Sequence, residues 1–140
     1  MLCRDQLAQL RRHAVEFAER HATVLTVTFG PASRMEAWLR ETQSPFVLLL
    51  DRPRAAYEAY SVHRSLASLS IAAVRRSREL MKEGQPATGL QGDPLQLGGT
   101  FVVDHSGIVR FAHRSATPVD YPPADDLLTV LGGLPASTAG

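Results

Sequence analysis

The residue best suited to chemistry is the only cysteine of the chain, and it stands third in the sequence. Cys3 lies in "MLCRDQLAQLRRHAVEF", where apolar residues recur at steps of three and four. This spacing predicts an amphipathic helix over about residues 3–20, with Leu7 and Leu10 on the same stripe as Cys3. In the first turn of a helix, unpaired backbone N–H groups and the helix dipole favour the thiolate, which is the nucleophilic form of cysteine. Cys3 is therefore the predicted catalytic residue of a thiol-dependent site.

Two opposing effects act on the Cys3 thiol. Arg4 supplies a neighbouring cation, which also favours the thiolate. The apolar stripe turns Cys3 inward, where burial favours the neutral thiol. The pattern leaves two interpretations open, a reactive thiol or a buried structural cysteine.

The other chemistry-bearing side chains indicate no cofactor and no metal site. No two histidines have metal-ligand spacing on a helix face; the five are His13, His21, His63, His105 and His113. The glycine-rich loop 84–99 lacks the Lys-Ser/Thr pair of a phosphate-binding loop. The four cations of the cluster at 75–82 are interpreted as a solvated helix face.

Length and composition indicate one globular domain. The chain has 140 residues, of which 44% are hydrophobic and 21% charged, and its net charge of +1 favours neither nucleic-acid nor membrane binding. A single cysteine excludes an internal disulfide framework and fits a reducing compartment. The charged segment 1–20 does not have the pattern of a secretory signal. We expect a soluble cytoplasmic domain over 1–134, followed by a disordered tail at 135–140.

Strand and helix patterns alternate after the first helix. The β-branched run at 23–29 predicts a strand closed by Gly-Pro, and Ser33 with Glu36 has the spacing of a capping box for a helix over 34–42. That helix is expected to bury Met35, Trp38 and Leu39. The continuous apolar run at 45–51 predicts a strand buried on both faces of a parallel sheet.

The second half of the chain predicts two more helices, a β-hairpin and a last helix. The helices are expected over 53–62, with Pro53 in the first turn, and over 66–83. The loop 84–99 leads into strands 100–104 and 108–114. The last helix spans 122–134, with Asp125 and Asp126 where acidic groups favour the helix dipole.

This order of elements predicts an α/β fold with a mixed sheet, in which 23–29 and 46–50 are parallel neighbours and the hairpin strands are antiparallel. The helix over 3–20 has an apolar face but no strand before it. Because right-handed crossovers place a strand ahead of such a helix, we expect the sheet to lack one central strand. The two halves of the sheet should then meet poorly.

Four segments together resemble the AhpC/TSA-type, peroxiredoxin-like branch of the thioredoxin fold. They are "VLTVTF", "PFVLLLDRPRAAYEAYSV", "GGTFVVDHSGIVRFAHRS" and "PPADDLLTVL", and the resemblance extends over about 3–133. It implies a thioredoxin-like mixed sheet flanked by helices, with the missing strand between 23–29 and the hairpin. Similar relatives carry Cys-x-x-Cys at the start of the first helix. Cys3 matches the second cysteine, and the first would fall just before Met1.

The resemblance also implies roles for particular residues. Cys3 would be the resolving thiol of the pair, and in this chain an external thiol would have to take the missing role. Gly99 and Thr100 would border the thiol site as substrate-binding residues. Gly99 stands where thioredoxins have a cis-proline, and "GG" stands where peroxiredoxins have an arginine.

Two functions follow from these residues. The first is a thiol-dependent oxidoreductase that reduces a peroxide or a disulfide. The second is a non-catalytic thioredoxin-like binding module, or an incomplete chain. In either case an exposed sheet edge favours association into homo-oligomers.

Overall fold

The computed structural model describes residues 2–65, 75, 78, 79, 82, 95–117 and 120–135, and of residues 2–4 it describes the backbone. The elements are α1 (Leu2–Arg12), α2 (Ala14–Glu19), β1 (Leu25–Thr28), α3 (Ala32–Thr42), β2 (Val47–Leu50), α4 (Ala55–Ala59), β3 (Gly99–Val103), β4 (Val109–Arg114) and α6 (Ala124–Gly132). Most of the helix expected over 66–83, most of the loop 84–99 and most of the tail 135–140 lie outside the described residues.

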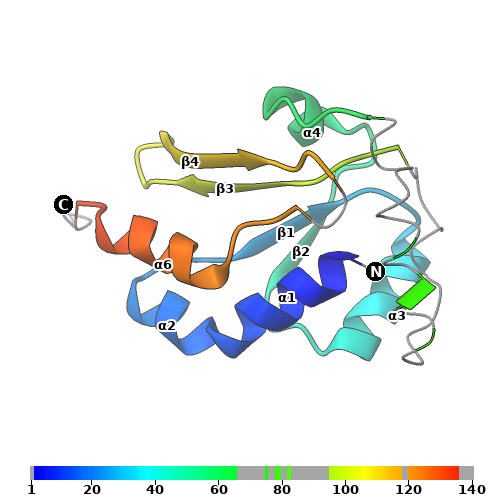
Figure 1. Ribbon diagram of the computed structural model, residues 1–140, viewed down its shortest axis with the longest axis horizontal. Coiled ribbons are helices and arrows are strands. Elements are labelled where there is room, and N and C mark those ends of the chain that lie inside the picture. Colours follow the sequence, from blue (N-terminus) through cyan, green and yellow to red (C-terminus); the bar gives the residue numbers. More distant parts are fainter. Residues whose placement is uncertain are drawn as a thin grey trace.

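The strands form two separate sheets of two strands each. β1 pairs with β2 in parallel, with Leu25 opposite Val47, and β3 pairs with β4 antiparallel, with Phe101 opposite Ala112. Both predicted pairings are confirmed. No strand in the described part of the chain joins β1 to β3, so the mixed α/β architecture is that of a thioredoxin-like sheet lacking a strand between its two halves (Figure 1).

Helices on one face hold the two half-sheets together. Leu10 of α1, Phe17 of α2 and three residues of α6 form the buried core; the three are Ala124, Leu127 and Leu128. Val24 and Phe46, next to β1 and β2, pack against this cluster, as do Val102 of β3 and Phe111 of β4. One set of helices therefore covers residues from both half-sheets (Figure 1).

On the opposite face, aromatic rings of the α4 region make a second connection. Tyr57 meets Phe29 edge-on, with ring centroids 5.4 Å apart, and its hydroxyl donates to the carbonyl of Val27 at 3.2 Å. Tyr60, just after α4, lies 4.7 Å from the ring of Phe101 in β3. A short helix thus contacts the end of β1 and the start of the hairpin.

The first helix is interrupted, so the prediction of one helix over 3–20 is wrong. His13 donates its backbone N–H to Leu10, three residues back, at 3.1 Å, and its ring bonds the carboxylate of Glu16 at 2.5 Å. This tighter turn separates α1 from α2. The apolar stripe survives the break, because Leu7, Leu10 and Phe17 are all buried as predicted.

Two helix starts differ from the sequence prediction. α3 begins at Ala32 and Pro31 is its N-cap, so Ser33 lies inside the helix and caps nothing. The carbonyl of Pro31 already accepts the N–H groups of Arg34 and Met35. α4 begins at Ala55, which leaves Pro53 outside the helix instead of in its first turn.

The α4 start is set by a carboxylate. Asp51 accepts the backbone N–H groups of Ala55 at 2.9 Å and Ala56 at 2.8 Å. These bonds fix the helix start with Arg54 at the N-cap, in the left-handed region at φ 60°. Residues 60–62 have left the helix, which is therefore shorter than the predicted 53–62.

Burial in the first half-sheet is lower than predicted. One face of β1 and β2 leaves its apolar side chains between 36% and 54% exposed; they are Leu25, Val27, Val47 and Leu49. Burial of the strand at 45–51 on both faces is therefore wrong, because no described element packs closely over this face. The expected burial of α3 is also wrong, since Met35, Trp38 and Leu39 are half-buried.

The hairpin turn is organised by Asp104. One carboxylate oxygen accepts the N–H groups of Ser106 at 2.9 Å and Ile108 at 3.0 Å, and the other meets Nε of Arg110 at 2.6 Å. Gly107 takes the left-handed φ of 81° that the turn requires. The backbone bond from Ile108, followed by the Arg110 side chain, lowers the pKa of Asp104 below its ordinary value.

Truncation of Phe17 should be strongly destabilising. The ring is only 4% exposed at the junction of α2 and α6, so Phe17→Ala should lower the free energy of unfolding by about 3–5 kcal/mol. Val15, two residues away and 70% exposed, gives the matched control, and Val15→Ala should change stability by less than about 0.5 kcal/mol. Urea denaturation measures both, and similar losses would contradict this account of the core.

Asp104→Asn should remove a pH-dependent part of the stability. A carboxylate with a lowered folded pKa stabilises the fold above its unfolded pKa of about 3.9, and this contribution disappears as the pH falls through the folded pKa. The wild-type chain should therefore exceed the variant in stability at pH 6, and the difference should shrink toward zero in acid. Urea midpoints across the pH range test this, and a difference independent of pH would contradict it.

Candidate functional site

The start of α1 is tied to the start of β3. Gln6, one turn into α1, donates from Nε2 to Oγ1 of Thr100 at 2.8 Å, and both side chains are half-buried. The two residues are 94 positions apart in the sequence. A predicted substrate-binding residue thus lies against the helix that carries the predicted thiol.

Cys3 stands in the first turn of α1, as predicted, and its side chain lies outside the described residues. Residues three apart on a helix occupy the same side, so the Cys3 position lies one turn before Gln6. The backbone therefore places Cys3 and Thr100 in one region of the molecule. Sequence reasoning missed Gln6, although a polar residue three positions after the cysteine was the available signal.

Gly99 is the first residue of β3, and its structural role is close packing. A Cβ there would come within 2.7 Å of Cε2 of Phe101 and 3.1 Å of Cγ2 of Val62. A larger residue would displace the Phe101 ring, which contacts both Tyr60 and the guanidinium of Arg114. This packing is a sufficient physical reason for glycine. The substrate-binding role of Gly99 stays a prediction.

Gln96 fixes the segment that leads into β3, and the sequence analysis did not predict this role. Its Nε2 donates to the carbonyls of Val62 at 3.2 Å and Leu97 at 3.1 Å, while its Oε1 accepts from Arg54 at 3.2 Å. An isolated antiparallel bridge to Arg64 lies at the same place. One amide thus connects the segment after α4 to the entrance of β3, and no sequence pattern marked it.

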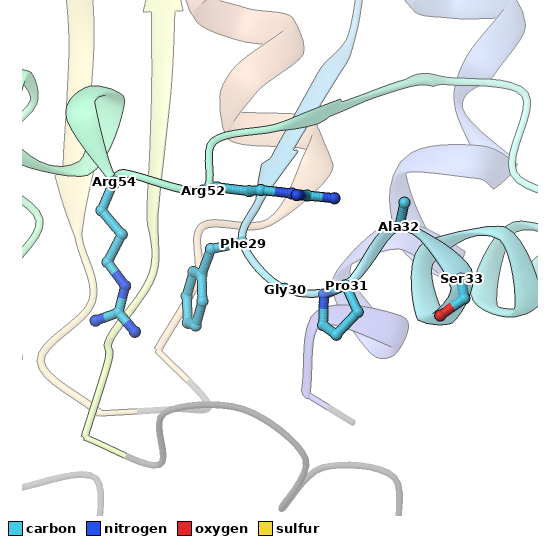
Figure 2. A pocket seen from close by; sticks show the side chains of 7 residues that line it. All are labelled: Phe29, Gly30, Pro31, Ala32, Ser33, Arg52 and Arg54. Atoms are coloured by element: carbon cyan, nitrogen blue, oxygen red, sulfur yellow. The ribbon is translucent and has the colours of Figure 1, made fainter.

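An open cavity of about 670 Å³ lies at the carboxyl ends of β1 and β2 (Figure 2). It is lined by the β1–α3 turn and the segment after β2; the residues are Phe29, Gly30, Pro31, Ala32, Ser33, Arg52 and Arg54. Gly30 has φ 136°, a conformation that strains any residue with a side chain. Neighbouring parallel strands end at the same edge of their sheet. This rule could have predicted that "GP", which follows β1, and "DRPR", which follows β2, lie close together.

Two histidines bond carboxylates and so connect neighbouring segments of the structure. His13 bonds Glu16 within the break between α1 and α2, and His113 meets Asp120 at 2.9 Å beyond β4. The backbone N–H of Ala116, followed by His113, lowers the pKa of Asp120.

Among the described residues, no three His, Cys, Asp or Glu side chains group to hold a metal ion. No described helix is long and apolar enough to cross a bilayer.

Comparison with known families identifies the fold. Residues 9–117 match the model of a family described as AhpC/TSA antioxidant enzyme. The protein belongs to this family. The match confirms the peroxiredoxin-like resemblance and the thioredoxin-like reading of the two half-sheets. It includes Gly99 and Thr100 and begins after Cys3.

Individual relatives agree with this assignment. The chain is 30% identical over 113 residues to alkyl hydroperoxide reductase E of Mycobacterium bovis and of Mycobacterium tuberculosis, a match that covers 79% of this chain and 57% of the relative. It is 24% identical over 143 positions to human peroxiredoxin-like 2C, covering 94% of this chain and 63% of that protein. The chain thus spans a little over half the length of the relatives it matches.

The contact between Gln6 and Thr100 should be measurable as a coupling. Gln6→Ala and Thr100→Val each remove one partner of a half-buried hydrogen bond, and the double variant should be more stable than the sum of the two losses predicts, by about 0.5–1.5 kcal/mol. Urea denaturation of the four proteins measures this interaction energy. Additive losses would show that the bond does not hold α1 against β3.

Proposed function

We propose that this protein is a thiol-dependent oxidoreductase of peroxiredoxin-like type, which reduces a peroxide or a disulfide through Cys3 with an external thiol as reductant. The observation that carries the proposal is the bond between Gln6 and Thr100, in a chain of an antioxidant enzyme family. It holds α1, whose first turn contains Cys3, against the strand start at which the resemblance implies a substrate-binding edge. The relatives named alkyl hydroperoxide reductase favour an organic hydroperoxide as the substrate.

The reaction needs only one protein thiol. The Cys3 thiolate attacks the terminal oxygen of the hydroperoxide, and the O–O bond breaks. Cys3 becomes a sulfenic acid, and the leaving alkoxide takes a proton from water to give an alcohol. An external thiol condenses with this sulfenic acid to give a mixed disulfide and water. A second external thiol attacks the mixed disulfide, which restores the Cys3 thiol and releases the oxidised reductant.

One feature of the chain, together with the proposed cytoplasmic location, supports an external reductant. Cys3 is the only cysteine of the sequence, so no internal disulfide can form. A reducing cytoplasm would supply small thiols such as glutathione at the site. The catalytic role of Cys3, the substrate-binding roles of Gly99 and Thr100, and the cytoplasmic location are parts of this proposal.

A second candidate function is a non-catalytic thioredoxin-like binding module. The observation in its favour is that the family match begins at residue 9 and leaves Cys3 outside. Exposed apolar side chains on β1 and β2 would then serve association with a partner or with a second copy of the chain. The two candidates differ in whether the thiol turns over.

Peroxide consumption by the purified chain should depend on both Cys3 and an added thiol. Mixed with tert-butyl hydroperoxide and glutathione, the wild-type protein should consume peroxide faster than the protein-free mixture, and omission of glutathione should limit it to one equivalent. Cys3→Ser should reduce consumption to the protein-free rate, because serine forms no sulfenic acid. Val15→Ala, an exposed change on α2, is the matched control and should keep the full rate.

The same assay separates the two candidates. Turnover that persists in Cys3→Ser would overturn the proposed role of the thiol. Absence of turnover in the wild-type chain, with Cys3 still alkylated by iodoacetamide, would overturn the enzyme and favour the binding module.

A further inference from the structure

We infer that the cavity between the β1–α3 turn and the segment after β2 is a binding site for an anionic group, a carboxylate or a phosphate, of a small ligand. The inference rests on the two arginines that line the cavity (Figure 2). It also rests on Arg52, which has no acidic partner among the residues that the structure describes. It is independent of the proposed thiol chemistry.

Arg52 is the principal cation of this site. Its side chain is exposed and extends along Gly30 and Pro31 toward the start of α3 (Figure 2). Among the described residues it has no hydrogen-bond or ion-pair partner. A guanidinium offers several N–H donors in a plane, a geometry that matches the two oxygens of a carboxylate or phosphate.

The neighbouring carboxylate does not neutralise Arg52. Asp51 precedes it in sequence, but both oxygens of Asp51 accept backbone N–H groups of α4, from Ala55 and Ala56. None of the described residues that line the cavity is acidic. The positive charge is therefore available to a ligand.

Arg54 gives the cavity a second, more rigid cation. Its guanidinium lies 4.1 Å from the ring centroid of Phe29 and also donates to Gln96 at 3.2 Å. These contacts hold the side chain in place, so less conformational entropy is lost when an anion binds beside it. Arg54 is thus fixed against one wall, whereas Arg52 is free to close on a ligand.

Backbone donors complete the lining. The first N–H groups of α3, at Ala32 and Ser33, have no hydrogen-bond partner among the described residues, because Pro31 offers no side-chain cap. They line the same cavity as Arg52. The arginines carry the inference, and these N–H groups add donors in the direction in which Arg52 extends.

The site also lies at the end of the molecule where α1 begins. Arg11, at the end of α1, donates to the carbonyl of Thr42, at the end of α3, at 2.7 Å. Figure 1 draws the N-terminus, where α1 begins, at the same end of the molecule as α3. Figure 2 shows the start of α1 beside the β1–α3 turn. A ligand anchored at Arg52 would therefore be near the helix that carries Cys3.

Titration of the full chain with inorganic phosphate, and separately with acetate, at constant ionic strength tests the inference. Two-dimensional amide NMR spectra should show saturable shifts at Gly30, Ala32 and Ser33 with at least one probe. The tighter-binding probe identifies the class as phosphate or carboxylate. Arg52→Gln should weaken binding about tenfold or more, and Arg52→Lys should weaken it less because the charge remains.

Arg40→Gln is the matched control, since this exposed arginine lies in the last turn of the same helix. It should leave the affinity unchanged within about twofold, because exposed charges a helix length away are largely screened. Three results would overturn the inference: no saturable shifts with either probe, equal affinity in Arg52→Gln, or an equal loss in Arg40→Gln. None of these measurements depends on Cys3, so the outcome is separate from that of the peroxide assay.

Discussion

The structure depends on helices that pack against both half-sheets, because no β-ladder among the described residues joins them. Within the described residues no backbone hydrogen bonds join β1 to β3. The two half-sheets are instead held by side-chain packing and by a few side-chain hydrogen bonds, such as that of Gln6 to Thr100. Leu10 and Phe17 meet the buried face of α6 on one side, and Tyr57 and Tyr60 reach both half-sheets on the other. Packing of this kind is less directional than a ladder, because dispersion and apolar burial tolerate small displacements that backbone hydrogen bonds do not. The relative position of the half-sheets is therefore set by a few large side chains.

This constraint explains both the exposed surfaces and the local rigidity. A sheet of only two strands leaves much of its surface uncovered, which accounts for Leu25 and Val47 at the edge of the first half-sheet being about half exposed. Turns and helix starts are instead fixed by carboxylates, Asp51 at α4 and Asp104 in the hairpin, each accepting two backbone N–H groups. Because each bond is local, these segments keep their shape without a continuous sheet. The cavity at Arg52 lies beside the segment that Asp51 fixes, whereas the approach to Thr100 is fixed by the amide of Gln96.

The predicted pairings succeeded because β-branched and apolar runs and a tight turn act over a few residues. The hairpin around Asp104 and the parallel pair of β1 with β2 needed no knowledge of the rest of the chain. Predictions of helix starts failed where competing hydrogen bonds decided them. Ser33 has the spacing of a cap, yet Pro31 takes the capping position because its carbonyl already accepts two N–H groups. The break at His13 was not predicted because the apolar stripe continues through it, and the stripe was the pattern that predicted the helix.

The sequence by itself determined the order of elements, the buried stripe of the first helix, the family resemblance and the position of the only thiol at a helix start. These depend on residue types and on spacings of two to four positions. Only the tertiary structure decided that Gln6 meets Thr100, that Gln96 joins the segment after α4 to β3, and that Arg52 and Arg54 face one cavity. Such contacts join residues far apart in the chain or on different loops. They are fixed by the packing of whole elements, which local patterns do not encode.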